Sequence, residues 1–412
     1  MGFQLNTNQD KVMNLKNEYE KMFSSEQKSV LAQVGRFADS KGINAYLIGG
    51  VVRDLILNRP LFDIDIVVEC DAILFAQQLV TAVRGEVLGT QERLRTAKVL
   101  FQNGVEVDFS STRKEFYNAS GQLPLLSEFG CALEEDVKRR DFTVNTLALK
   151  LGNFELINFL GGREDIEKKQ LRVLHGKSFI DDPSRLVRML KFSVRFGFEI
   201  ESETRKLAQE YLNNIDNSMP LERIKGEFRQ LFSLNNQLSY SKTILTGIYR
   251  LVGFEPVDFS QDRLDYCLQN GLVSPSFSWF IPFACLSVNS QNYFDRLNLT
   301  SQEKRCLSDF SLLLNRDCPS VEAENFEIYE RYSKLSSDAV VCEFVSLGSE
   351  SAKKYLETIK DVRVSINGND LISLGFVPSE QFKIIFDEVL KQKLSGKLRT
   401  KVEELEFVKK FL

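Results

Sequence analysis

Hydrophobic and polar positions along the chain change their spacing near residue 150. Between about 28 and 150, short apolar runs alternate with helical stretches, and the runs AYLIGG, FDIDIVVE, TAKVLFQ and VEVDFS are typical of strands. From Leu156 onward the apolar residues recur at helical spacing, as in DPSRLVRMLKFSVRF. The pattern therefore predicts an α+β domain at the N-terminal end, followed by an all-α region.

Breaks in the helical pattern near 235–236 and 348–351 divide the all-α region further. At 412 residues the chain is also too long for one ordinary domain. We expect five segments, which we call an N-terminal helical extension (1–27), a head (28–150), a helical neck (151–235), a helical body (236–348) and a helical tail (349–412).

The composition indicates a globular protein but does not identify what it binds. A hydrophobic content of 43% fits a globular protein with a sizeable core. The net charge of −4 does not exclude nucleic acid, because phosphate contacts depend on local basic surface. The seven cysteines are scattered without a CxxC pair, which argues against a zinc site or a disulfide framework. With no signal peptide and no apolar run of about 20 residues, we expect a cytoplasmic protein.

The chain contains a single histidine, His175. Ser-His-Asp and Cys-His catalysis and metal sites made of several histidines would all have to rest on this one residue. We interpret His175 as structural. If the protein is an enzyme, its chemistry is therefore expected to depend on carboxylates and metal ions.

A glycine pair follows the first predicted strand. Gly49 and Gly50 open the run GGVVRD, which also contains Arg53. Paired glycines allow the backbone to turn tightly and to approach a phosphate, whose charge is met by backbone N–H groups. Taken alone, the pair is explained equally well by an ordinary turn between a strand and a helix.

Two carboxylates follow on the next predicted strand. Asp63 and Asp65 are two positions apart, so they project from the same face of a strand. Two neighbouring carboxylates repel each other, and Mg²⁺ ions relieve the repulsion and can support two-metal phosphoryl transfer. A solvated edge strand is the alternative. Asp108, on a later strand, is a candidate third ligand, with Glu106 as its competitor on the same face.

These motifs together resemble a known family. GGVVRD followed by DID resembles the signature of the DNA polymerase β nucleotidyltransferase superfamily, and more narrowly the class II tRNA nucleotidyltransferases and bacterial poly(A) polymerases. The run RRDFTVN (139–145) is similar to the family's ribose-selecting motif, and DDPSRLVR (181–188) to its nucleobase-selecting motif. Glu222, Arg223 and Glu227 match a further element that looks architectural, and the resemblance extends into the tail.

The resemblance implies template-independent addition of C and A from CTP and ATP to the 3′ end of tRNA, by two-metal phosphoryl transfer with Mg²⁺. The tail and body would bind the acceptor arm of the tRNA. No oligomeric state is predicted. The implied site residues are Asp63 and Asp65 as metal ligands, with Asp108 as a third catalytic carboxylate; Gly49, Gly50 and Arg53 for the triphosphate; Arg140, Asp141 and Asn145 for the ribose; Asp182 and Arg185 for the nucleobase; and Arg188 and Arg195 for phosphate or primer.

Base selection by Asp182 and Arg185 has a simple physical rationale. The two residues are three positions apart and therefore neighbours on a helix. The carboxylate can accept a hydrogen bond from the amine of C or A, and it repels the carbonyl that U and G present there, while the guanidinium donates to the same base edge. The alternative is that Asp182 caps the helix. Arg188 and Arg195 are equally compatible with structural ion pairs.

The product is not fixed by the motifs. Members of this family add CCA, CC or A, or make poly(A), and the stretch GTQERLRTAKVLF lacks the basic-aromatic run of the poly(A) polymerases, which favours tRNA. The sequence departs from the family at Asn158, where relatives often have Asp, and in GFVPSEQF of the tail. A catalytically inactive RNA-binding relative is the remote alternative. It is disfavoured because all the charged residues that catalysis and selection would need are present: Asp63, Asp65, Arg140, Asp141, Asp182 and Arg185.

Overall fold

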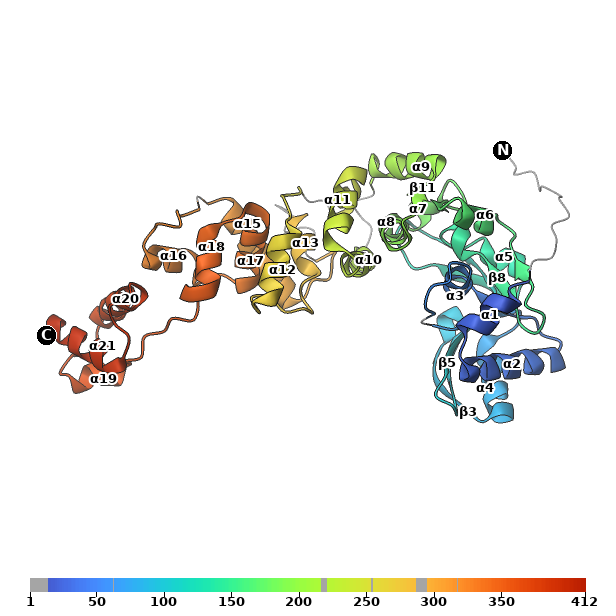
Figure 1. Ribbon diagram of the computed structural model, residues 1–412, viewed down its shortest axis with the longest axis horizontal. Helices are drawn as coiled ribbons and strands as arrows, with labels where there is room; N and C mark the ends of the chain where they lie inside the picture. Colours follow the sequence, from blue (N-terminus) through green and yellow to red (C-terminus); the bar gives the residue numbers. More distant parts are fainter. Residues whose placement is uncertain (1–13, 62, 216–220, 253–254, 287–294, 317) are drawn as a thin grey trace. The chain divides into compact units, whose positions relative to one another are not determined.

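The computed structural model describes residues 14–61, 63–215, 221–252, 255–286, 295–316 and 318–412 (Figure 1). The chain divides into two compact units, Met1–Pro220 and Leu221–Leu412. The first unit contains every strand of the described residues, and the second is helical, which confirms the predicted fold class. Residues 1–13 of the predicted extension, and Phe62 beside the acidic pair, lie outside the described residues.

A mixed seven-stranded sheet forms the centre of the first unit. Its strands, in chain order, are β1 (Ala45–Ile48), β2 (Asp65–Val68), β3 (Gly85–Gln91), β4 (Thr96–Phe101), β5 (Glu106–Ser111), β8 (Ala148–Lys150) and β9 (Leu156–Ile157). They are arranged in the order β3-β4-β5-β2-β1-β8-β9, and all neighbours are antiparallel except β2 and β5. The four predicted strands correspond to β1, β2, β4 and β5, whereas the pattern does not predict β3, which contains two glycines.

Two further pairs of short strands belong to the first unit. They are β6 (Arg113–Phe116) with β7 (Leu125–Phe129), which is antiparallel, and β10 (Gln170–Leu171) with β11 (Glu199–Ile200), which is parallel. The helices are α1 (Lys16–Met22), α2 (Ser25–Ser40), α3 (Gly50–Ile56), α4 (Ala72–Val83), α5 (Leu133–Val137), α6 (Gly162–Glu167), α7 (Ser178–Asp181), α8 (Ser184–Phe196) and α9 (Ser202–Leu212), with the 3₁₀ turns η1 (Glu92–Leu94) and η2 (Thr143–Asn145).

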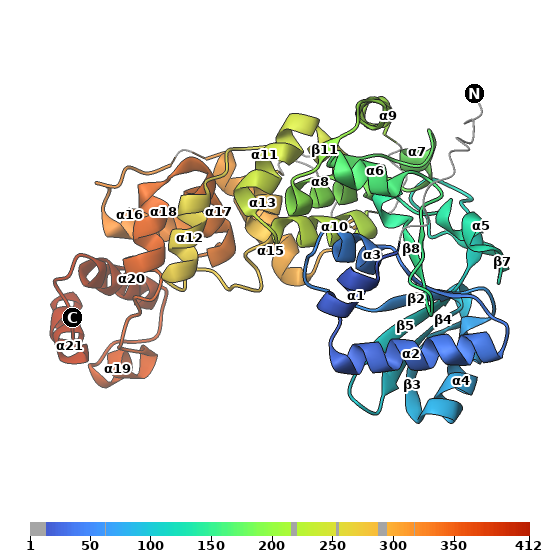
Figure 2. The same ribbon diagram turned by 45° about the vertical axis from the view of Figure 1, so that its right-hand side comes forward.

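Helices α2 and α4 cover one face of the sheet (Figure 2). Their contact is aromatic: the ring centroid of Phe75 on α4 lies 5.3 Å from that of Phe37 on α2 and 5.7 Å from that of Phe109 on β5. Side chains cap the starts of both helices, Ser24 in a capping box before α2 and Asp71 before α4. The other face of the sheet carries a second hydrophobic cluster, in which Val67 of β2 packs with Val137 of α5, and the polar side chains at the ends of β2 and β5.

The second unit consists of short helices. They are α10 (Glu222–Phe232), α11 (Asn236–Thr246), η3 (Ile248–Val252), α12 (Gln261–Gln269), α13 (Phe280–Cys285), α15 (Ser301–Leu314), α16 (Asn325–Tyr332), α17 (Ser337–Leu347), α18 (Glu350–Lys354), η4 (Tyr355–Ile359), α19 (Gly368–Ser373), α20 (Gln381–Leu394), α21 (Lys401–Val408) and η5 (Lys409–Phe411). Helices do break at the two predicted positions, where Asn235 caps α11 and Gly348 ends α17 in the left-handed conformation. Glu222 of α10 accepts a hydrogen bond from Asn298 within the same unit.

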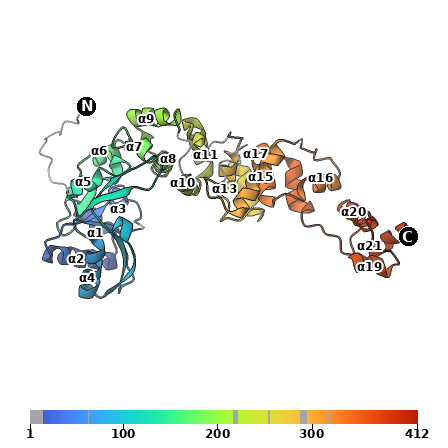
Figure 3. The same ribbon diagram turned by 180° about the vertical axis from the view of Figure 1, so that it is seen from behind.

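The three last α-helices form a small core of their own (Figure 3). Leu371, Ile385 and Val408, one from each helix, are fully buried. Glu404 is buried beside them and is neutralised by Lys393, while it also accepts the backbone N–H groups of 365 and 366. The predicted tail therefore has a hydrophobic core and a satisfied buried charge. Among the residues that the model describes, no helix is both long enough and apolar enough to cross a bilayer.

Close packing at Gly162 gives a test of the first unit. A Cβ atom at this position would lie 2.2 Å from the carbonyl oxygen of Thr143, on the turn that carries the predicted ribose-selecting residues. We expect Gly162→Ala to lower the free energy of unfolding by about 1–3 kcal/mol, because the backbone has to move. Denaturant unfolding of the full chain measures this. Gly226→Ala in α10, where a Cβ meets no atom within 4 Å, is the control and should not be destabilising; equal effects would contradict the prediction.

Candidate active site

The acidic residues of the predicted metal site come from two adjacent strands. β2 and β5 run parallel, with Asp65 paired to Asp108 in the register. Phe109, the next residue on β5, packs on α4, and successive side chains of a strand point to opposite faces. Asp108 and its cross-strand neighbour Asp65 therefore project together from the face that α4 does not cover.

Asp63 lies just before β2, and it is exposed like Asp65, whereas Ile64 between them is buried. The alternation agrees with the predicted placement of both acids on one face. Loss of hydration within the surrounding protein, and then repulsion from Asp108 and Asp63, raise the pKa of Asp65, while Arg140 acts in the opposite direction. Asp63 and Asp108 are thus close enough to disfavour the charged form of Asp65.

Lysine is the cation nearest to Asp108. The Nζ atom of Lys98 on β4 lies 3.5 Å from the Asp108 carboxylate and 3.1 Å from that of Glu106. Asp108 therefore shares its lysine with Glu106, the residue that competes with it for the role of third ligand. The register places Lys98 and Asp108 directly opposite each other on antiparallel strands.

Chemically, the donor set suits a hard cation. Mg²⁺ prefers oxygen ligands and is usually held by one or two carboxylates, with substrate phosphates and water completing its shell. Within the described residues, no group of three or more His, Cys, Asp or Glu side chains is gathered closely enough to enclose an ion. Two exposed acids, one with a raised pKa, fit a metal that arrives together with a nucleotide, and Asp63 and Asp65 would hold it.

The glycine pair forms the turn between β1 and α3. Gly49 has φ +71° and ψ −120°, a conformation that side chains disfavour, and its N–H donates to the carbonyl of Leu147. A Cβ atom on Gly49 would lie only 2.9 Å from a guanidinium nitrogen of Arg140. The turn therefore brings the predicted triphosphate loop beside a predicted ribose-selecting residue. Gly50 begins α3.

Arg53, predicted to bind the triphosphate, is 4% exposed. Its guanidinium pairs with Asp54 at 2.8 Å, donates to the side-chain oxygen of Asn145, and lies 4.4 Å from the ring centroid of Phe196 and 5.3 Å from that of Phe192. These contacts connect α3 to η2 and α8. The triphosphate role of Arg53 stays a prediction, and the geometry adds a bracing role.

Asp141 of the predicted ribose-selecting set lies at the centre of a hydrogen-bond network. One carboxylate oxygen accepts from the N–H of Phe142 and from Asn145 at 2.8 Å, and the other accepts both Nε and an Nη of Arg188 at 2.9 and 2.7 Å. Burial opposes the charge, but Arg188 and the hydrogen bonds outweigh it and lower the pKa of Asp141 to about 2. Asp141 therefore remains ionised.

Arg195, about two turns further along α8 than Arg188, has a comparable partner. It pairs with Asp54 at 3.1 Å, and the centroid of the Phe196 ring lies 5.1 Å from its guanidinium. Arg59 donates to the backbone carbonyl of Arg195 and lies on the same ring. Of the two interpretations left open for Arg188 and Arg195, the geometry supports structural ion pairs; phosphate contact stays a prediction.

The predicted nucleobase readers are both buried. Asp182 accepts from the N–H and the hydroxyl of Ser184 at the start of α8, as the capping alternative expects. Arg185 donates to the hydroxyl of Ser178 at 2.8 Å and to the carbonyl of Arg139 at 3.0 Å. The Nε2 atom of His175 lies 4.0 Å from a carboxylate oxygen of Asp181 in α7. Burial, and after it repulsion from Arg185, lowers the pKa of His175.

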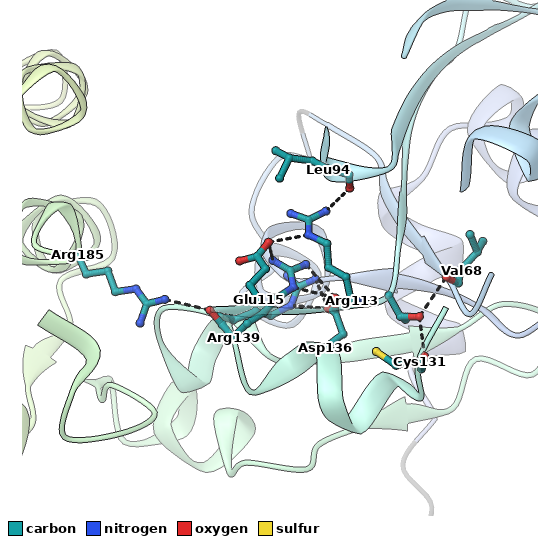
Figure 4. A network of polar contacts seen from close by, with 10 residues as sticks. Val68, Leu94, Arg113, Glu115, Cys131, Asp136, Arg139 and Arg185 are labelled. Atoms are coloured by element: carbon teal, nitrogen blue, oxygen red, sulfur yellow. Dashed lines mark hydrogen bonds and ion pairs between the residues drawn. The ribbon is translucent and has the colours of Figure 1, made fainter. Parts of the chain in front are cut away.

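A charged network that the sequence analysis does not anticipate surrounds Asp136 on α5 (Figure 4). Asp136 is fully buried and forms ion pairs with Arg139 at 2.9 Å and Arg140 at 3.1 Å. Glu115 of β6 connects Arg139 to Arg113. The spacing of Asp136 three and four residues before a pair of arginines is the signal in the sequence that indicates this role.

The first unit therefore gathers most of the predicted residues into two connected groups. One is the exposed acidic face of β2 and β5, and the other is the network that runs through η2, α3 and α8. Arg140 lies between the two groups. It opposes the rise in the pKa of Asp65, forms an ion pair with Asp136, and lies beside the Gly49 turn.

The depressed pKa of Asp141 predicts acid sensitivity. Because its pKa is lower in the folded state than the ordinary value near 4, its contribution to stability is present above about pH 4 and is lost as the pH falls toward 2. The pKa difference corresponds to about 2 kcal/mol. Urea unfolding between pH 5 and pH 2.5 should show a smaller loss for Asp141→Asn than for the unsubstituted protein. Parallel pH profiles for the two proteins would contradict the assignment.

Comparison with known proteins agrees with this geometry. The family model described as the poly A polymerase head domain matches residues 45–172. An A-adding tRNA nucleotidyltransferase of Halalkalibacterium halodurans is 28% identical over 93% of this chain and 92% of its own length. That of Geobacter sulfurreducens is also 28% identical, but this chain spans only 46% of its length. A CCA-adding enzyme of Leuconostoc mesenteroides is 32% identical over 49% of each chain.

Solved structures share the fold. The apo form II of a CCA-adding enzyme has a TM-score of 0.81 at 24% identity, covering 97% of this chain and 99% of its own. The Thermotoga maritima CCA-adding enzyme in complex with tRNA has a TM-score of 0.72 at 22% identity, covering 96% and 98%. Residues 45–172 therefore match a poly A polymerase head domain, and over nearly its whole length the chain is similar to A-adding tRNA nucleotidyltransferases.

Proposed function

We propose that this protein is a tRNA nucleotidyltransferase that transfers the terminal adenosine from ATP to the 3′ end of tRNA. The observation that carries the proposal is the parallel register of Asp65 and Asp108, which sets two carboxylates side by side on an open face of a nucleotidyltransferase head. Among the sequence relatives described above, the two A-adding enzymes match about nine-tenths of the chain and the CCA-adding enzyme matches about half of it, which favours A addition. The CCA-adding structures share the fold along 96–97% of the chain.

In the proposed reaction, the 3′ oxygen of the tRNA attacks the α-phosphorus of the nucleotide, and the bond to the departing pyrophosphate breaks. Mg²⁺ held by Asp63 and Asp65 would supply charge neutralisation and activation of the hydroxyl. Asp108 provides a third carboxylate beside them, which can accept the proton that the 3′ hydroxyl loses. The Gly49 turn lets the triphosphate approach the backbone of α3, with the Arg140 guanidinium beside it.

Selection of the nucleotide follows from the buried network. Asp141, just before η2, and Asn145 on η2 would check the ribose together with Arg140. Asp182 would present its carboxylate to the base, because a carboxylate accepts a hydrogen bond from the amine of C or A. Arg185 has five N–H donors, of which Ser178 and the Arg139 carbonyl use two. The remaining donors are available to the edge of C or A.

The activity is tested with the purified full chain, Mg²⁺ and three tRNA transcripts that end before CCA, after C and after CC. Each transcript receives ATP, CTP, both, or UTP and GTP, and the products are sized on a sequencing gel. We expect one adenosine on the transcript that ends in CC. Completion of CCA on the shortest transcript would assign a CCA-adding enzyme, a stop after CC a CC-adding enzyme, and a long ladder of A a poly(A) polymerase.

Substitution of the acidic pair tests the chemistry. We expect Asp65→Ala to lower the incorporation rate by about 100-fold or more, because charge stabilisation at the reacting phosphate is removed. Glu106→Gln should leave the rate nearly unchanged if Asp108 is the third carboxylate, and the converse result would assign that role to Glu106. Asp258→Ala, at an exposed aspartate of the second unit, is the control. Absence of incorporation by the unsubstituted protein would favour an inactive RNA-binding relative.

A further inference from the structure

Asp136 uses both of its carboxylate oxygens on the site. Oδ1 accepts the backbone N–H of Arg113 at 3.0 Å and Nε of Arg139 at 2.9 Å. Oδ2 accepts Nε and an Nη of Arg140 at 3.3 and 3.1 Å. The side chain is fully buried. One carboxylate therefore fixes two consecutive arginines and the start of β6.

The Arg139 side of this arrangement is reinforced from β6. Glu115, whose side chain is 4% exposed, bridges Arg139 at 3.3 Å and Arg113 at 2.6 Å. Arg113 in turn donates to the backbone carbonyl of Leu94 in η1 at 2.9 Å. The guanidinium of Arg139 thus pairs with Asp136 on α5 and with Glu115 on β6. Because the side chain is held at both places, the backbone of Arg139 is restrained as well.

The backbone of Arg139 is where this network reaches the predicted base readers (Figure 4). Its carbonyl oxygen accepts an N–H of Arg185 at 3.0 Å. Because the Arg139 side chain is anchored by Asp136, the carbonyl that orients Arg185 is anchored as well. On the other side, Asp136 holds Arg140, which stands beside the Gly49 turn and belongs to the predicted ribose-selecting set.

We propose that Asp136 is a positioning residue that sets base selection through Arg139 and Arg185 and sugar selection through Arg140. The inference rests on the proposed function, since it assigns Asp136 to the selectivity of that same site. Burial alone would raise the pKa of Asp136, but the two arginines lower it, so the carboxylate is charged at neutral pH and holds both guanidinium groups.

Asp136→Asn removes the charge of the side chain and keeps its shape. An amide has one acceptor oxygen and one donor nitrogen, so whichever way it is turned, its NH₂ group faces either Arg140 or the Arg113 and Arg139 donors. One of the two connections is therefore lost while the volume is kept. Arg139→Gln keeps the carbonyl that Arg185 contacts but removes the side-chain anchor of this carbonyl, and it leaves Asp136 paired with Arg140.

The test compares nucleotide binding by the full chain, measured by calorimetry with ATP, GTP and dATP, and nucleotide incorporation into a tRNA transcript ending in CC. For Asp136→Asn we expect the preference for ATP over GTP, or over dATP, or both, to fall about tenfold, the usual effect of losing a charge-assisted hydrogen bond. For Arg139→Gln only the preference for ATP over GTP should fall. If Asp136→Asn does not fold, the result for Arg139→Gln decides whether the network around Asp136 sets base selection.

Glu343→Gln is the matched control. Glu343 is also a fully buried acid, paired with Arg331 at 2.9 Å, but it lies in the second unit. Its substitution should lower stability and leave both preferences unchanged. Unchanged preferences in folded Asp136→Asn and Arg139→Gln would overturn the inference while incorporation by the unsubstituted protein upholds the proposed function. Selective binding without incorporation would overturn the proposed function alone, and absence of nucleotide binding would overturn both.

Discussion

The position of α8 against the head depends on the buried carboxylate of Asp141. It accepts two hydrogen bonds from Arg188 on α8 and one from Asn145 on η2. Asn145 in turn accepts from Arg53 on α3, whose guanidinium lies on an aromatic ring of α8. Acceptors and donors alternate along this path, so α3, η2 and α8 are joined by directional contacts in addition to apolar packing.

Such a network is costly to bury and is weak support for stability in itself. Removing charges from water costs several kcal/mol per ion, which only close and well-directed partners offset. Directional contacts instead favour one arrangement of the side chains, because any other arrangement leaves a buried charge only half satisfied. In this protein the arrangement concerns residues that would read a sugar and a base, where a displacement of about 1 Å matters.

Local sequence patterns predicted the elements and the acidic face well. Apolar alternation around Asp63 and Asp65 is a property of neighbouring positions, so both the strand and the shared face could be read directly. The pattern could not predict β3, because its glycines weaken the strand signal and its pairing with β4 compensates. It also could not show that Arg53 and Arg188 have internal partners, since those partners lie 92 and 47 residues away.

Asp136 was missed for a different reason. It follows two glutamates at the start of a short helix, where acidic residues are usually solvated and favour the helix dipole. Glu134 and Glu135 are on the surface and follow that rule. The spacing to Arg139 and Arg140 is a signal in the sequence, but the burial of Asp136 under β6, which sets it apart from the two glutamates, is seen only in the tertiary structure.

The parallel pairing of β2 with β5 also sets an order of assembly. β3 and β4 lie between the two strands in the sequence, and such non-local pairing is slow compared with helix formation. On a ribosome the acidic face could form once β5 had emerged, but Arg188 reaches Asp141 only after α8 has followed. A nascent head would thus acquire the acids that we propose for phosphoryl transfer before the residues that we propose for choosing a nucleotide, and it would become selective last.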